Sequence, residues 1–281
     1  MSHARRLRSA VVGLCLSIVT LSAAAAPARA EGAVGFDRLW SLLQLSPLIA
    51  VMQQEGMTQA EALGFDYLPY PPGAGWTALA RRIYDGEIMD RSMRASFAAA
   101  LGPEPLTDLV DFFDSPLGAQ IVAGEVATRR AFLDPATEAA ARAVLSDPAS
   151  DTTRLRLIDR YIAVNDLIEF NVTGALNSNF RFYLGLGEGG ALALSEAEML
   201  DEIWSQEDST RSETEDWLRA YLHAAYRDLD DAGLSRYIAL SETAQGQRLN
   251  RALFQAFAQM YDDIYYALGL AIADQMATQD L

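Results

Sequence analysis

The sequence predicts an all-α fold of about ten helices, built as two related helical hairpins packed around a long central helix. Apolar residues recur every three or four positions through most of the chain, which is the spacing of one face of an α-helix. No segment indicates the parallel strands of an α/β fold. The pattern of one helical corner also returns later in the chain, which indicates two related units.

The first corner lies within residues 106–132, where two helices are predicted to meet. Ser115 is suited to cap the second helix, Pro116 suits its first position, and Gly118 permits a close approach of another backbone. The apolar face of the first helix consists of Leu106, Leu109, Val110 and Phe113.

The same pattern recurs after 128 residues without a gap. The capping residue is repeated as Thr243 and the glycine as Gly246, while Ala244 takes the place of the proline. A cap and a glycine in one register are harder to obtain by chance than apolar matches alone. We therefore predict an internal repeat, with repeat 1 at about 85–132 and repeat 2 at about 213–265.

The stretch FFDSPLGAQI resembles the signature of the bacterial domain-of-unknown-function 2059 family, an aromatic pair followed by Ser-Pro-x-Gly and an apolar residue. The resemblance is specific over roughly 105–132 and weaker over 217–265. It implies a secreted, all-helical protein. Because members of this family have no agreed activity, the resemblance implies no catalytic residue.

Residues 1–30 have the pattern of a secretory signal peptide. Three arginines precede an apolar run at 10–26, and Ala28-Arg29-Ala30 is an A-x-A cleavage site. Cys15 suggests a lipoprotein as an alternative, but it lies in the middle of the run and follows the large Leu14. We expect cleavage after Ala30, a periplasmic mature chain, and no membrane span in that chain.

The charge of the chain restricts its partners. The sequence has 22 basic and 38 acidic residues, a net charge of −16, and every basic residue is Arg. The signal contains four arginines and no acid, so 18 basic against 38 acidic residues leave −20 in the mature chain. Such a charge repels phosphate, which argues against nucleic acid and anionic membranes as partners.

The mature chain is expected to form two units. The N-terminal helical unit spans 31–147, and residues 148–281 comprise a bridging long helix and the C-terminal unit, with SDPASD at 146–151 as the linker. The long helix is predicted at about 153–184. Helix starts are predicted from capping boxes at Thr58 with Glu61, Ser195 with Glu198 and Ser212 with Glu215, and a helix break is predicted at Pro47.

The long helix is unusual in its asparagines. Asn179 falls on its apolar stripe, Asn165 lies at the border, and Asn171 lies between them. Buried amides need hydrogen-bonding partners. They could line a polar seam that holds a ligand between the two units, or they could bond to neighbouring loops and helix ends, which is the commoner use of such groups.

No catalytic, cofactor or metal site is predicted. The only cysteine lies in the signal, there is no lysine, and the mature chain has one histidine, His223. GLGEGG at 185–190 matches a dinucleotide fingerprint but follows a helix rather than a strand, so it is expected to end that helix. DLDDAG at 228–233 lacks the oxygen ligands of a calcium loop and is expected to be a corner.

These observations favour a soluble periplasmic binding or interaction protein, whose partner is an unknown small molecule or an envelope protein. Two alternatives remain open. One is a holdase-like structural protein of the envelope, and the other is a hydrolase that uses paired carboxylates. The sequence does not indicate the ligand, the oligomeric state or the pathway.

Overall fold

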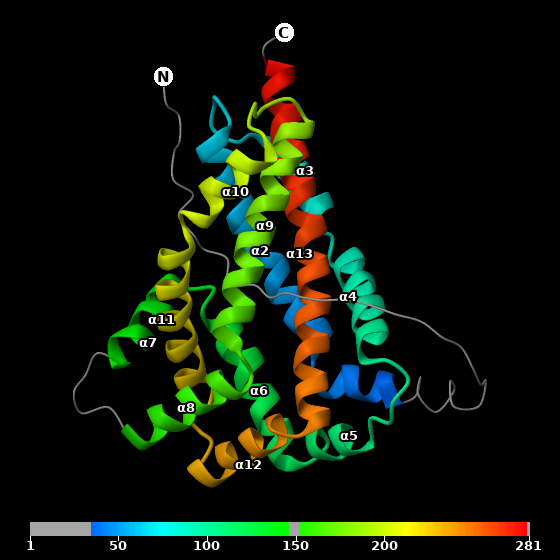
Figure 1. The fold of residues 1–281 in the computed structure, drawn as a ribbon, viewed down its shortest axis with the longest axis vertical. Coiled ribbons are helices and arrows are strands. Elements are labelled where there is room, and N and C mark those ends of the chain that lie inside the picture. Colours follow the sequence, from blue (N-terminus) through cyan, green and yellow to red (C-terminus); the bar gives the residue numbers. More distant parts are fainter. Residues whose placement is uncertain (1–34, 146–151, 280–281) are drawn as a thin grey trace.

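The computed structural model describes residues 35–145 and 152–279, and within them the chain is all-α (Figure 1). A short helix at residues 35–42 comes first. The following helices are α2 (Leu45–Tyr67), α3 (Ala74–Ile83), α4 (Gly86–Leu101), α5 (Thr107–Phe113), α6 (Pro116–Ala131), α7 (Pro135–Leu145), α8 (Thr152–Val164), α9 (Leu167–Glu188), α10 (Glu196–Trp204), α11 (Glu207–Ala225), α12 (Asp231–Ser241) and α13 (Ala244–Gln279). The predicted fold class is confirmed, with more helices than the expected ten.

The centre of the fold is the pair α9 and α13, which run side by side along the long axis of the molecule (Figure 1). Their backbones meet where two glycines face each other. A Cβ on Gly185 would lie 2.3 Å from the carbonyl oxygen of Tyr266, and one on Gly269 would lie 2.2 Å from that of Phe182. Since a real Cβ cannot approach so closely, glycine at both positions is what allows the two helices to touch.

The remaining helices cover this pair on two sides. α4 packs along α13, with α2 and α3 beside it, and the apolar face of α4 is fully buried. On the other side α11 packs against α9, α6, α7 and α8, and α12 packs against α8 and α13. The arrangement gives one continuous hydrophobic core that extends from the N-terminal helices to α13.

The two predicted corners have the same local geometry. Ser115 Oγ accepts a hydrogen bond from the Gly118 amide at 3.1 Å and donates one to the Phe112 carbonyl at 2.5 Å. At the second corner, Thr243 Oγ1 accepts from the Gly246 amide at 3.0 Å and donates to the Leu240 carbonyl at 2.7 Å. Pro116 occupies the first position of α6, as predicted.

The two corners also contact each other. Phe112 stacks on Tyr237 of α12 with the ring centroids 5.9 Å apart. Gln245, directly after the second corner, donates a hydrogen bond to Asp108 of α5 at 2.8 Å. The equivalent elements of the predicted repeats therefore pack together at one end of the molecule, where Figure 1 shows α5 and α12.

The predicted long helix at 153–184 is divided into two, and this expectation is corrected. α8 ends at Val164, and Asp166 adopts a left-handed conformation with φ of 52° before α9 begins. The turn redirects the chain, so α8 lies across the bundle end while α9 runs along α13 (Figure 1). α9 continues to Glu188, and the glycines that follow end it, as predicted.

Two of the three predicted capping boxes are wrong. Ser195 and Glu198 form the expected reciprocal pair at the start of α10. Thr58 and Glu61 instead lie in the interior of α2, and Ser212 and Glu215 lie inside α11. The predicted break at Pro47 is also displaced, because the chain turns at Gln44, with φ of 50°, and Pro47 falls in the first turn of α2.

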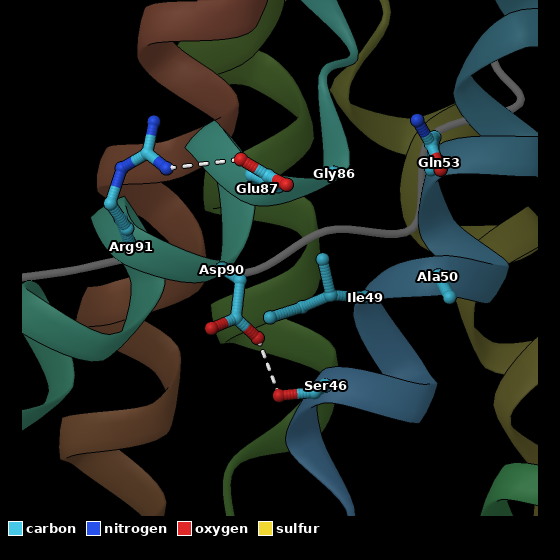
Figure 2. A pocket seen from close by; sticks show the side chains of 8 residues that line it. All are labelled: Ser46, Ile49, Ala50, Gln53, Gly86, Glu87, Asp90 and Arg91. Carbon is cyan, nitrogen blue, oxygen red and sulfur yellow. Dashed lines mark hydrogen bonds and ion pairs between the residues drawn. The ribbon is translucent and has the colours of Figure 1, made fainter.

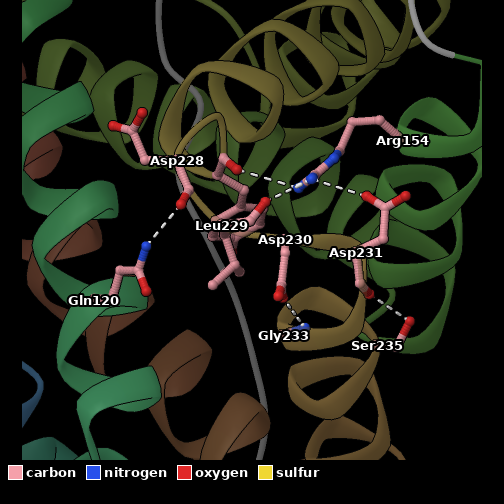
Figure 3. Close-up of polar contacts among 9 residues, drawn as sticks. Gln120, Arg154, Asp228, Leu229, Asp230, Asp231, Gly233 and Ser235 are labelled. Carbon is pink, nitrogen blue, oxygen red and sulfur yellow. Dashed lines mark hydrogen bonds and ion pairs between the residues drawn. The ribbon is translucent and has the colours of Figure 1, made fainter.

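The stretch 228–233 is a corner, as predicted, and it is held by contacts to two other helices (Figure 3). Asp230 caps α12 by accepting a hydrogen bond from the Gly233 amide at 2.6 Å. Arg154 of α8 donates to the Leu229 carbonyl at 2.5 Å and pairs with Asp231 at 2.8 Å. In the described part of the chain, no cluster of three or more His, Cys, Asp or Glu could hold a metal ion.

Two expectations concern residues that the structure does not describe. The signal peptide at 1–30 and the linker at 146–151 both lie outside the described ranges. Among the helices of residues 35–145 and 152–279, none combines the length and the apolar character required to cross a membrane.

We predict that Gly118→Ala and Gly246→Ala each lower the free energy of unfolding by about 1–3 kcal/mol. The added methyl groups would lie 2.3 Å from the Phe112 carbonyl oxygen and 2.0 Å from the Leu240 carbonyl oxygen. Urea denaturation followed by circular dichroism measures the change.

Gly75→Ala is the matched control, because a Cβ at this position in α3 meets nothing within 4 Å. It should raise stability by about 0.5 kcal/mol through helix propensity. Equal effects of the substitution at all three glycines would contradict the close contacts at the corners.

Candidate binding cavity

A cavity of about 210 Å³ lies where α2, α6, α8, α9, α11 and α13 come together. Its lining is mainly apolar, with aliphatic side chains between aromatic rings. We call it the aromatic cavity after its aromatic side chains, Tyr161, Trp217, Tyr221, Phe254, Phe257 and Tyr261. Concave apolar sites with a few polar groups are typical of small-molecule binding.

The aromatic rings are held in place by stacking. Trp217 and Tyr221 are four residues apart on α11, so they lie on one face of the helix, and their rings stack at 4.8 Å with an interplanar angle of 8°. Phe254 of α13 stacks on Phe170 of α9 at 4.4 Å. These pairs fix the rings as rigid surfaces.

The carboxylate in this cavity belongs to Glu125, on the buried side of α6. α6 and α11 approach closely here because residue 124 is Gly, at which a Cβ would lie 2.4 Å from the Ala225 carbonyl oxygen. The approach lets Tyr226 donate a hydrogen bond from its hydroxyl to Glu125 Oε1 at 2.6 Å. Tyr221 donates to the backbone carbonyl of Glu125 at 2.9 Å.

Tyrosines from three helices surround the Glu125 carboxyl group. Burial raises the pKa of Glu125 to about 7, and the hydrogen bonds from Tyr226 and Tyr237 oppose this increase. Burial, and then the charge of Glu125, raise the pKa of Tyr226 and Tyr237 well above the usual value. Tyr161 stacks on Tyr237 at 5.0 Å and completes the group.

Arg129, one turn after Glu125, bonds to a different carboxylate. Its Nε and NH2 donate to the two oxygens of Glu55 at 2.6 and 2.7 Å, a bidentate pair that is mostly buried. The guanidinium also lies over the Trp217 ring, 5.4 Å from its centroid. Arg129 and Trp217 line both the aromatic cavity and a second one of about 350 Å³, which we call the flanking cavity.

A third cavity, of about 480 Å³, lies between α2 and α4, and we call it the α2–α4 groove (Figure 2). Ser46 donates a hydrogen bond to Asp90 at 2.5 Å, and Arg91 pairs with Glu87 at 3.6 Å. Figure 2 shows these polar side chains directed at one another. The groove contains no aromatic ring, and its charges are paired within it, so the aromatic cavity is the stronger candidate.

The three asparagines considered as a polar seam lie at different positions relative to the cavities. Asn171 lines the aromatic cavity, and its Nδ2 donates to the Leu167 carbonyl at 2.6 Å. Asn165 lies at the turn between α8 and α9, donates to the Tyr161 carbonyl at 3.0 Å, and accepts at its own carbonyl from Asn250 at 2.7 Å. Asn179 is buried in α9 but lines none of the three cavities.

Sequence reasoning missed Glu125 and the tyrosines around it. One signal was available, because Glu125 follows Ile121 by four residues and therefore lies on the apolar face of α6. The tyrosines were not recognisable as a group, since Tyr161, Tyr226 and Tyr237 are contributed by α8, by the end of α11 and by α12.

Glu125→Gln should change how stability depends on pH. The pKa of Glu125 is about 7 in the folded protein against the usual 4.5, so its contribution to stability is fully present below about pH 4.5 and is lost as pH rises through 7. The loss amounts to roughly 3 kcal/mol. The difference in unfolding free energy between the wild type and Glu125→Gln, measured from pH 4 to 8, should therefore favour the variant increasingly with pH.

Glu242→Gln provides the control, because this exposed glutamate pairs with Arg160 outside the cavity. A flat difference between the wild type and Glu125→Gln across this pH range would show that the carboxyl group is not enclosed.

A comparison with protein families matches one segment of the chain. No match was found among curated proteins or among solved structures. The family match covers nearly all of α4 and all of α5, α6 and α7, and it includes Glu125 and Arg129 of the aromatic cavity. Residues 87–147 match the model of a family described as "Uncharacterized protein conserved in bacteria (DUF2059)", so the resemblance that the corner motif indicated is confirmed over this segment.

Proposed function

We propose that this protein is a periplasmic, non-catalytic binding module that holds a small, largely apolar molecule in the aromatic cavity. The observation that carries this proposal is the cavity itself, which combines rigid aromatic walls with a few polar groups from the surrounding helices. Its volume of about 210 Å³ suits a molecule with one aromatic ring or a short aliphatic body.

The position of the cavity agrees with the predicted internal repeat. α6 of the first unit forms one wall, and α11 and α13 of the second unit form the facing walls. The equivalent hydrogen bonds at Ser115 and Thr243 support a duplication of one helical corner. A ligand in this seam would contact both units, and Asn171 of α9 would be among its neighbours.

The number and the pairing of the carboxylates near the cavity favour binding over catalysis. A hydrolase with paired carboxylates needs two acids free to act on one bond. Glu125 is a single carboxylate in the aromatic cavity, and the nearby Glu55 is held by Arg129. The proposed periplasmic location rests on the signal-peptide pattern at residues 1–30.

A holdase-like role is the second candidate, and one surface observation favours it. Three large side chains remain exposed: Trp204 of α10 at 61%, Phe65 of α2 at 56%, and Tyr70 in the loop after α2 at 67%. A holdase would suppress aggregation of an unfolded client at substoichiometric amounts, and the triple Ala variant of these residues would lose that effect. Absence of suppression by the wild-type protein would remove this candidate.

Leu253→Trp should abolish ligand retention, because Leu253 lines the aromatic cavity and a larger ring would fill it. The protein is purified from the periplasm without denaturant, and native mass spectrometry then measures the bound mass. We expect a discrete small molecule on the wild-type protein and none on the variant.

Leu200→Trp makes the same change on α10, where Leu200 is 40% exposed, and should retain the ligand. A ligand that persists in Leu253→Trp would place binding elsewhere. A wild-type protein free of any small molecule, both as purified and after incubation with periplasmic extract, would contradict the binding function.

A further inference from the structure

We propose that the ligand of the aromatic cavity is a small organic cation, an amine or quaternary ammonium with an apolar body, whose charged group is held by the Glu125 carboxylate and the aromatic rings beside it. This inference rests on the binding role proposed above and adds the chemical class of the ligand. It follows from the charge inside the cavity, from the side chains that surround that charge, and from the surfaces that the rings present.

Glu125 lacks a cationic side chain as a partner within the described part of the chain. No ion pair among the described residues includes it. Arg129 is the nearest candidate on the same helix, but two of its nitrogens are bound to Glu55. Buried charges are ordinarily paired, so a lone carboxylate in a cavity is a position where a bound cation would restore the balance.

The Glu125 carboxyl group is also bound by tyrosine hydroxyl groups. Tyr226 donates to Oε1 at 2.6 Å, and neither Tyr226 nor Tyr237 lines the cavity. Glu125 itself lines the cavity, as do Tyr161 and Tyr221. Tyrosines outside the cavity therefore bind the carboxyl group, while Glu125 itself is among the residues that line the cavity.

The aromatic rings that line the cavity are suited to a cation. Aromatic faces attract ammonium and guanidinium groups through the negative charge at the centre of the ring. This protein already uses that interaction, since Arg129 lies over Trp217, and Arg94 lies over both Phe36 and Trp40. An ammonium group beside Glu125 would meet ring surfaces of the same kind, and the apolar part of the ligand would contact the aliphatic lining.

Binding of a cation should depend on the ionisation of Glu125. Burial raises the pKa of Glu125 to about 7, so the cation-binding form increases as pH rises through neutrality. The other charged and titratable groups on the packed elements are Arg129 (α6), Glu55 (α2), Tyr161 (α8), Tyr221 (α11), Tyr226 (after α11), Tyr237 (α12) and Tyr261 (α13). Affinity for a cation should therefore increase from about pH 5.5 to about pH 8, and binding should release protons.

The test uses three probes of one size and different charge: phenethylamine, 2-phenylethanol and phenylacetate. Isothermal titration calorimetry of the full mature chain measures the affinity of each. We expect phenethylamine to bind about tenfold more tightly than the alcohol at pH 8, and phenylacetate to bind most weakly. The preference for the amine should shrink at pH 5.5.

Glu125→Gln tests the residue directly, because the amide has the shape of the carboxyl group without its charge. The variant should weaken phenethylamine binding about tenfold and leave 2-phenylethanol binding nearly unchanged. Glu242→Gln removes a charge from an exposed ion pair with Arg160 and should bind all three probes as the wild type does. Circular dichroism confirms that each variant is folded.

Several outcomes would overturn the inference. Equal binding of amine and alcohol, tightest binding of phenylacetate, or no effect of Glu125→Gln would each show that the cavity does not select a cation. Failure of all three probes to bind would also contradict it. Each of these results leaves the proposed binding function to be decided by the co-purification experiment with Leu253→Trp, so the two proposals fail separately.

Discussion

The close crossing of α9 and α13 is the constraint on which the rest of the structure depends. Gly185 and Gly269 face each other there, and a side chain on either one would lie within about 2.3 Å of the opposite backbone. The close approach that these glycines permit brings many atoms of α9 and α13 into van der Waals contact. α13 spans 36 residues and contacts helices from both predicted units, so its position relative to α9 sets where the others can pack.

The aromatic cavity lies well away from that crossing, at the other end of the same helix pair. Asn171 and Phe254 are 14 and 15 residues from the crossing glycines, which corresponds to about 20 Å along each helix. There the two helices are joined by the Phe170–Phe254 stack, and α6 and α11 close the space beside them. A second close approach, at Gly124 and Ala225, brings Glu125 beside the tyrosine hydroxyl groups. Close contacts between helix backbones therefore position both the α9–α13 pair and the Glu125 carboxyl group.

The sequence was informative where one local signal had one physical meaning. A Ser or Thr followed three residues later by Gly predicted both corners, because the side chain caps the helix and the missing Cβ admits the preceding turn. It was less informative where backbone conformation had no proline or glycine to mark it. Asp166 and Gln44 both turn the chain at positive φ, and only the Asn165-Asp166 pair carried a residue type that tolerates this conformation. Glu125 was visible on the apolar face of α6, but its meaning comes from tyrosines on other helices, which no local pattern brings together.

The aromatic cavity contains the carboxyl group of Glu125, which forms no ion pair with any residue that the structure describes. The most direct measurement of its ionisation is a 13C NMR titration of the glutamate side-chain carboxyl carbons, with the Glu125 resonance assigned by its absence in Glu125→Gln. The structure predicts a midpoint near pH 7 for Glu125, because burial raises its pKa to about 7. A midpoint near the usual value of 4.5 would contradict the burial of this carboxyl group against the tyrosines, and with it the pH dependence inferred for cation binding.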